Sequence, residues 1–340
     1  MSDLNRSRFS LVTGVILANA SLDVALHDTY TFIIPNNNID EITHLAFNNQ
    51  LLTSNKEWNL VNNNISNGLI MVPMIKDEKL AAFVVGLIDG EGSLEVNHRK
   101  KKYLQYRLVV KLKNNGLNLR MLKHIASIYG GQVNITPKHK VLTSVNLCFG
   151  VISVLKTASQ YVQWTINDKE IIEKTILPLF ATNPPLTTRI TLQLAFVIKA
   201  LDGMTIKEYL ELRKLKYITR PSLIPLFDTL PTYFSSWLSG FIEVKGSFAI
   251  RSGPIGFSLT MSQLNDDYLM FAILKYFNLQ HMTIQLKNHI YSIEIANKKG
   301  VETVVKHIVD YPLQGYKYYQ LAKVMKDSKS LSHLRGVFWK

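Results

Sequence analysis

The chain has 340 residues, of which 47% are hydrophobic, and this is enough for one large domain or two domains with sizeable cores. Its formal net charge of +14 predicts a polyanionic partner, with nucleic acid first and an anionic membrane second, because lysines and arginines near phosphates release condensed counterions. The single cysteine, Cys148, excludes an intramolecular disulfide framework and a cysteine-rich zinc site, and no uninterrupted apolar run is long enough to predict a membrane span.

The N-terminal quarter of the chain differs from the rest. Residues 31 to 76 are rich in asparagine and lack sustained periodicity, which favours loop or disorder over a packed unit. We interpret them as a tether that joins a leader, residues 1 to 30, to the remainder of the chain.

From Lys79 onward, helix-like and strand-like runs appear twice in the same order. In the first repeat, assigned to residues 77 to 198, the predicted elements are Leu80 to Gly90, Ser93 to Asn97, Tyr103 to Lys113, Leu117 to Tyr129, Gly131 to Thr136, Val145 to Phe149, a strand ending at Ile166, and Lys169 to Phe180 capped by Asn167 or Asp168. In the second, residues 237 to 340, they are Trp237 to Val244, Ser247 to Arg251, Phe257 to Ser262, Asp267 to Phe277, Met282 to Lys287, Tyr291 to Ile295 and Gly300 to Val309.

The two repeats also end alike, since Pro184 is followed five positions later by Arg189, and Pro312 by Lys317. Between the repeats, residues 199 to 236 contain a charged helix and three prolines, and we interpret them as a linker. The order of elements predicts an α+β protein built from an internal duplication.

Each repeat opens on a similar peptide, VVGLIDGEG from Val84 and LSGFIEVKG from Leu238. Gly86 and Gly90 lie four apart on one helix face, where the missing side chains let another helix approach closely. Gly92 and Gly246 follow the helix ends, and we expect them to stop the helices in the left-handed conformation.

The last charged position of each peptide differs between the repeats. Glu91 places a carboxylate at the negative end of the helix dipole, which costs roughly 0.3–1 kcal/mol, so stability alone would not select it. Lys245, at the matching position, is what stability alone prefers.

These peptides and their downstream order resemble the LAGLIDADG family of homing endonucleases and maturases over roughly residues 79 to 326. The resemblance implies two pseudo-symmetric αββαββα repeats whose signature helices, containing Gly86, Gly90 and Gly240, pack side by side under a saddle-shaped DNA-binding sheet surface. It implies that the last acidic position of each motif binds divalent metal, Mg²⁺ in an active enzyme. Those positions are Glu91, the one predicted metal ligand, and Lys245, where an ammonium replaces a carboxylate.

The resemblance implies further site residues. Arg189 and Lys317 are expected near the scissile phosphates, although an ordinary helix surface is an equal alternative. Glu243 cannot replace Lys245, because two residues along a helix rotate a side chain by about 200°. For Asp89 and Glu243 we expect a structural role.

A basic strand face is the predicted nucleic-acid surface. Alternation in the strand Tyr103 to Lys113 places Gln105, Arg107, Val109, Lys111 and Lys113 on one face, behind a basic loop of Arg99, Lys100, Lys101 and Lys102. The comparable positions of the second repeat are more neutral and are Arg251, Ser258, Thr260, Ser262, Thr283, Gln285 and Lys287. We expect phosphate contacts mainly in the first repeat and base contacts in the second, a solvated strand face being the alternative.

Residues Thr13 to Tyr30 resemble a segment of cytochrome c oxidase subunit I. His27 and Asp28 match residues at a magnesium site of the oxidase, but the rest of that chain is absent, so we expect no metal binding by them. The resemblance predicts an exon read in frame into a group I intron of a mitochondrial oxidase gene, and a product in the mitochondrial matrix.

Two main functions follow from these expectations. The first is an RNA-binding maturase that helps its host intron to splice, with DNA cleavage impaired by Lys245 and no need for a catalytic metal. The second is a homing endonuclease that cuts or nicks intronless oxidase alleles. A structural nucleoprotein subunit is a third, more remote function. The predicted partners are double-stranded DNA at the oxidase exon junction, host intron RNA, or both, bound by a monomer with an internal pseudo-dimer and without a membrane.

Overall fold

The computed structural model describes residues 9–14, 30–35, 77–137, 140–147, 150–157, 160–217, 229–250, 257–329 and 331–339. The chain divides into two compact units, Met1–Asn67 and Gly68–Lys340. In the first unit, β1 (Phe9–Gly14) pairs antiparallel with β2 (Tyr30–Pro35). The expectation of loop or disorder is therefore wrong for residues 31–35, where aromatic and β-branched side chains favour a strand.

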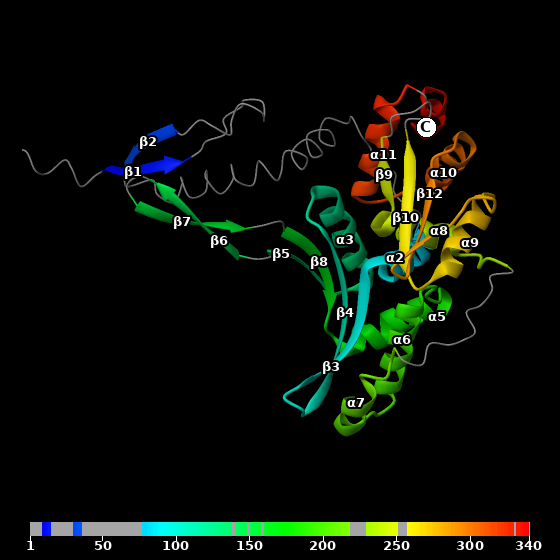
Figure 1. Ribbon diagram of the computed structural model, residues 1–340. Coiled ribbons are helices and arrows are strands. Elements are labelled where there is room, and N and C mark those ends of the chain that lie inside the picture. The colour runs from blue at the N-terminus through cyan, green and yellow to red at the C-terminus, as the bar shows by residue number, and fades with distance from the viewer. Residues whose placement is uncertain are drawn as a thin grey trace, which may run out of the picture. The chain divides into compact units, whose positions relative to one another are not determined.

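The first repeat of the second unit contains a four-stranded antiparallel sheet in the order β3-β4-β8-β5, shown in Figure 1. Its elements are α2 (Asp77–Glu91), β3 (Gly92–Arg99), β4 (Tyr103–Lys113), α3 (Gly116–Tyr129), β5 (Gln132–Pro137), β8 (Gln160–Ile166), and the continuous helical run of α4 (Lys169–Ile171), η3 (Ile172–Ile176) and α5 (Leu177–Thr182). The predicted cap Asp168 is confirmed, because its side chain accepts from the backbone N–H groups of Glu170 and Ile171.

A second hairpin is inserted between β5 and β8. It consists of β6 (Lys140–Leu147) and β7 (Gly150–Thr157), which pair antiparallel. The sequence predicted one strand here, Val145 to Phe149, and β7 was missed. Residues 148 and 149, including Cys148, lie outside the described residues.

The second repeat forms an equivalent antiparallel sheet in the order β11-β12-β10-β9. Its elements are α8 (Phe234–Lys245), β9 (Ser247–Ala249), β10 (Ser258–Leu264), α9 (Asp267–Tyr276), β11 (Gln285–Lys287), β12 (Ile290–Ile295) and α10 (Lys298–Asp310). The same order of elements in both repeats confirms the predicted α+β duplication.

Further helices follow each repeat and were not predicted as separate elements. They are α6 (Thr188–Leu201) after the first, and α11 (Tyr316–Asp327), η4 (Ser332–Leu334) and α12 (Arg335–Phe338) after the second. The boundary predicted at residue 198 thus falls inside α6. The charged helix of the predicted linker is α7 (Ile206–Leu212), and it packs on the first repeat, because the Tyr209 hydroxyl donates to the Val96 carbonyl over 3.1 Å.

The two signature helices α2 and α8 pack directly against each other, and they lie in the right half of Figure 1. A Cβ at Gly86 would lie 1.9 Å from the Trp237 carbonyl oxygen, and one at Gly240 would lie 1.9 Å from the Phe83 carbonyl oxygen. A Cβ at Gly90 would lie 2.1 Å from Val244. These glycines are therefore required for the close approach, as the spacing predicted.

The reason for glycine after each helix differs from the prediction. Neither Gly92 nor Gly246 has a positive φ, and Gly246 is extended at φ −70 and ψ 145. At both positions the chain instead passes directly from helix into strand. A Cβ at Gly92 would lie 2.7 Å from the Ile88 carbonyl oxygen, and a Cβ at Gly246 would lie 2.6 Å from the Ile242 carbonyl oxygen. The expectation of a left-handed stop is wrong, and close packing on the last helical turn replaces it.

Candidate nucleic-acid interface

A buried carboxylate near the end of α2 holds the start of α6. Asp89 is fully buried and accepts from the Leu186 N–H at 2.7 Å, from the Thr187 N–H and hydroxyl at 3.2 and 2.5 Å, and from Trp237 Nε1 at 2.7 Å. Burial raises the pKa of Asp89 to about 6, although its hydrogen bonds oppose that rise. Asp89 therefore has the structural role that was expected.

Glu243 does the same for the second repeat. Its buried carboxylate accepts from the backbone N–H groups of Gln314, Gly315 and Lys317 at the start of α11, at 3.2, 3.1 and 3.0 Å. Burial raises the pKa of Glu243 against these hydrogen bonds. This carboxylate is committed to the helix end and is not available at the surface.

Glu91 and Lys245 meet at the ends of α2 and α8. Lys245 Nζ lies 3.4 Å from Glu91 Oε2, and the two side chains are 29% and 48% exposed, respectively. The positions that the resemblance pairs are thus adjacent in space, and they form a salt bridge across the repeat boundary. Half-exposed pairs of this kind contribute about 0–1 kcal/mol to stability.

These residues do not fit a metal held by one carboxylate from each repeat. An ammonium stands beside the remaining carboxylate and repels a divalent cation. No group of three or more His, Cys, Asp and Glu side chains suited to a metal ion exists in the part of the chain that the structure describes. The role of Glu91 as a metal ligand stays a prediction.

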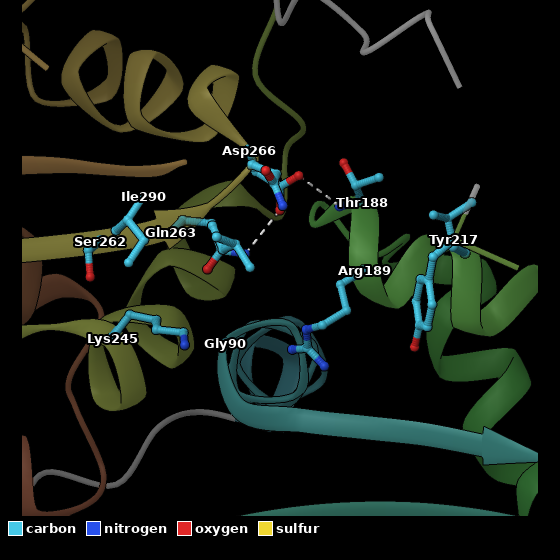
Figure 2. A pocket seen from close by; sticks show the side chains of 12 residues that line it. Gly90, Thr188, Arg189, Tyr217, Lys245, Ser262, Gln263, Asp266 and Ile290 are labelled. Carbon is cyan, nitrogen blue, oxygen red and sulfur yellow. Dashed lines mark hydrogen bonds between the residues drawn. The ribbon is translucent and has the colours of Figure 1, made fainter. Parts of the chain in front are cut away.

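Arg189 reaches the same helix end from the other side. Its guanidinium donates to the Asp89 carbonyl over 2.8 Å and to the Gly92 carbonyl, and so binds the backbone where α2 ends and β3 begins. Arg189 and Lys245 both line a cavity of about 440 Å³, and Figure 2 shows them on opposite sides of the α2 end.

The opposite wall of this cavity was missed in the sequence. Gln263 and Asp266 line it from the second repeat, and Gln263 Nε2 donates to Asp266 Oδ2 over 3.0 Å (Figure 2). Asp266 is 1% exposed and also accepts from the Thr188 N–H at 3.4 Å. The run Asn265-Asp266-Asp267 before α9 could have indicated a helix cap, but not a contact with the other repeat.

Lys317 does not lie in that cavity. It is partly buried near Glu243 at the start of α11, and burial lowers its pKa, with Lys113 adding to this effect and Glu243 opposing it. The matching residues Arg189 and Lys317 therefore occupy matching helices but different surroundings.

The predicted basic face of the first sheet is present. Gln105, Lys111 and Lys113 are exposed and Arg107 is partly exposed, while Leu108, Val110 and Leu112 are buried beneath the sheet. The turn before β4 contains Lys100 and Lys101 with φ of 51 and 55, and Arg99 to Lys102 are all exposed. The strand alternation in β4 thus separates a covered apolar face from an open basic one, except at Val109, which was expected on the open face and is buried.

The open face of the second sheet is more neutral, as predicted. Thr260 and Ser262 are partly exposed, and Thr283, Gln285 and Lys287 are exposed. Ser258, which was expected on this face, is fully buried at the start of β10, where it pairs with Ala249 of β9. Arg251 lies outside the described residues.

The sequence matches the family described as LAGLIDADG endonuclease over residues 84–199 and 238–326. The chain belongs to the LAGLIDADG family. Relatives of this LAGLIDADG chain include the "Probable intron-encoded endonuclease aI3" of Dictyostelium discoideum, 35% identical over 71% of this chain and 93% of that protein, and that of Dictyostelium citrinum, 33% identical over 72% and 93%.

A longer relative is known as well. The protein of the same name from Debaryomyces hansenii is 32% identical over 93% of this chain, and the chain spans 48% of the length of that relative.

Solved structures support the LAGLIDADG fold. The chain is similar to the LAGLIDADG meganuclease I-CpaMI bound to uncleaved DNA, with a TM-score of 0.55, 17% identity, and coverage of 76% of this chain and 95% of that one. It is also similar to the homing endonuclease I-GzeII in complex with its DNA target, with a TM-score of 0.52, 17% identity, and coverage of 76% and 94%. Within the described residues, no helix has the length and apolar character required to cross a membrane.

Proposed function

We propose that this chain is an intron-encoded nucleic-acid-binding protein that acts as a maturase, helping its host group I intron to splice in the mitochondrial matrix. The observation that carries the proposal is the salt bridge of 3.4 Å between Lys245 and Glu91, where a cleaving enzyme of the family would need two carboxylates. Binding and folding of RNA require basic surfaces but no catalytic metal pair.

Cleavage is the activity that this pair impairs. In two-metal phosphodiester hydrolysis, oxygen ligands hold Mg²⁺ against the attacking and leaving oxygens. The Lys245 ammonium supplies no such oxygen, and the nearby Glu243 is buried against the backbone of α11. A maturase role therefore needs no Mg²⁺ bound by the protein, and only a protein that cleaves DNA would require Mg²⁺ as a cofactor.

The two open sheet faces suit a long asymmetric nucleic acid. The basic side chains on β4 attract phosphates, and the neutral polar side chains on β10 and β11 offer hydrogen bonds to bases. Because the two repeats are covalently joined and unequal, one monomer with its internal pseudo-dimer can bind a site without symmetry. Host intron RNA is the partner of the maturase role.

The alternative function is an endonuclease that cuts or nicks intronless oxidase alleles at the exon junction. It is favoured by Glu91 and Arg189, which remain together at the end of α2, and by the names of the relatives. One carboxylate with one nearby arginine is the arrangement from which nicking of a single strand would come.

A splicing assay tests the maturase role. A transcript of the host intron with its flanking exons is incubated with the full-length protein, and spliced product is followed over time. We expect the protein to accelerate splicing, Lys111→Glu to weaken this by repelling phosphate, and Glu91→Gln to retain it, because no bound metal is needed. Absence of both acceleration and RNA binding, or loss of acceleration in Glu91→Gln with binding intact, would contradict the proposal.

A further inference from the structure

We propose that Lys245 and Arg189 form a binding site for a phosphodiester group of the bound nucleic acid, and that binding at this phosphodiester site requires no divalent cation. The inference rests on the proposed nucleic-acid-binding function. It concerns the cavity of about 440 Å³ between the end of α2 and strand β10.

The charges around this cavity favour an anion. Arg189 and Lys245 are the basic residues of its lining, and Asp266 is the acidic one. The Asp266 carboxylate already accepts hydrogen bonds from Thr188 and Gln263, whereas Glu91 is not part of the lining and its carboxylate faces Lys245. The cavity therefore presents two cations against one carboxylate that is engaged with other groups.

Both cations have donors for a phosphate. Arg189 uses N–H groups on the Asp89 and Gly92 carbonyls, and a guanidinium carries five such groups. Lys245 has three N–H donors on a flexible stem and pairs with Glu91 at 3.4 Å, a partly exposed contact that is easily exchanged. A phosphodiester oxygen can thus accept a hydrogen bond from the Lys245 ammonium, whether or not the salt bridge to Glu91 is kept.

The cavity opens on the face where nucleic acid is expected. Leu264 and Ile290 line it, are 55% and 43% exposed, and pair with each other across β10 and β12. Leu264 lies on the same face of β10 as Thr260 and Ser262, and Ile290 pairs with Lys287 of β11. A backbone that lies along this open face passes the mouth of the cavity.

The salt bridge removes the usual need for a cation. With a carboxylate at both signature positions, an approaching phosphate meets two negative charges and is repelled until a divalent cation neutralises them. With Lys245 in place, the Glu91–Lys245 pair is neutral and Arg189 offsets Asp266, so no net negative charge opposes the phosphate. The affinity of the chain for nucleic acid should therefore be the same with and without divalent ions.

The test measures affinity for a fluorescein-labelled, mixed-sequence duplex DNA at fixed salt, in EDTA and in CaCl₂. We expect the natural full-length chain to bind equally in both. We expect Lys245→Glu to bind roughly tenfold more weakly in EDTA and to recover in Ca²⁺, because two carboxylates then bind the ion. Lys287→Glu is the matched control, since it also reverses one charge on the face but creates no carboxylate pair, and its loss should not recover in Ca²⁺.

Two results would overturn the inference. One is a natural chain whose affinity rises more than about fivefold with Ca²⁺, and the other is a Lys245→Glu variant that recovers no more than Lys287→Glu. If Lys245→Glu does not fold, Lys245→Gln replaces it, and the dependence of log affinity on log salt in EDTA should fall by about 0.9. An unchanged slope would equally overturn the inference.

A melting experiment adds a measurement without nucleic acid. Ca²⁺ should raise the melting temperature of Lys245→Glu and leave that of the natural chain unchanged, because only the variant gains a metal site. A rise in the natural chain would contradict the inference. The splicing assay can contradict the maturase role independently of this inference. If the chain binds DNA equally in EDTA and Ca²⁺ but does not accelerate splicing, the maturase role is refuted and the proposed phosphodiester site stands.

Discussion

Trp237 Nε1 donates a hydrogen bond of 2.7 Å to Oδ2 of Asp89, so an indole on the second signature helix binds the carboxylate that holds α6 in the first repeat. The position of Trp237 in α8 corresponds to Phe83 in α2, which carries no donor for Glu243. The junction of the two repeats is therefore unequal in its buried hydrogen bonds as well as in its surface charges.

Trp237→Phe tests the contribution of this bond, because it keeps an aromatic ring but removes the N–H. We expect a loss of about 1–3 kcal/mol in the free energy of unfolding, since a buried acceptor loses a partner. Urea unfolding of Trp237→Phe, Asp89→Asn and the double variant measures the coupling between the two residues. Additive losses would show that the bond contributes nothing beyond the two side chains taken separately.

The pH dependence of stability tests the burial of Asp89. Its pKa is about 6 in the folded chain against an ordinary value of 3.8, so between these values the folded state binds a proton that the unfolded state lacks. The free energy of unfolding contributed by Asp89 should therefore fall as pH rises from about 4 to about 6 and level off above. When Asp89 is protonated, its carboxyl O–H can donate a hydrogen bond to the Thr187 hydroxyl oxygen.

Asp89→Asn provides the comparison, because an amide does not titrate. The difference in unfolding free energy between the natural chain and this variant, measured in urea across that pH range, should shrink with rising pH. A difference that is constant with pH, or that grows, would show that Asp89 is ionised throughout.

Gly86→Ala tests the close approach of the signature helices. The new Cβ would lie 1.9 Å from the Trp237 carbonyl oxygen, so the helices must separate, and we expect a loss of at least about 3 kcal/mol or failure to fold. Gly336→Ala is the control, because nothing lies within 4 Å of its Cβ and it belongs to α12. Equal melting temperatures for the two variants would rule out the packing described for α2 and α8.

Lys111→Ala tests the basic face of the first sheet. Lys111 is exposed on the open side of β4, and its loss should weaken binding to duplexes of every sequence alike and lower the salt dependence by about 0.9 in log units. Lys306→Ala, an exposed lysine in the helical layer on α10, should change neither quantity. If both variants lose affinity equally, the charge of the whole chain, and not this face, attracts the nucleic acid.

The sequence predicted features that depend on local pattern. The alternation in β4 identified the open face with Lys111, and the spacing of Gly86 and Gly90 identified the packed helix face. Both follow from the periods of strands and helices, which are fixed by backbone geometry. The adjacency of Glu91 and Lys245 followed from the duplicated register of the two motifs.

Features that depend on the packing around a residue were missed or misjudged. Asp266 reads as a helix cap, but its contact with Thr188 of the first repeat joins residues 78 positions apart. Ser258 has the alternation of an open position but is fully buried, whereas Thr260 and Ser262 on the same face of β10 are partly exposed. Gly92 follows a helix like a left-handed stop, yet here the last turn of α2 leaves no room for a side chain. Residue type and periodicity alone do not specify this packing.

The central claim, that Lys245 impairs cleavage, is tested most directly on a duplex that spans the oxidase exon junction, with MgCl₂ and the natural chain, Lys245→Glu and Glu91→Gln. Double-strand breaks and single-strand nicks are counted separately over time. We predict that the natural chain makes double-strand breaks at least about tenfold more slowly than Lys245→Glu, and that Glu91→Gln makes none. A natural chain that cuts both strands at a rate unchanged by Lys245→Glu would contradict the claim.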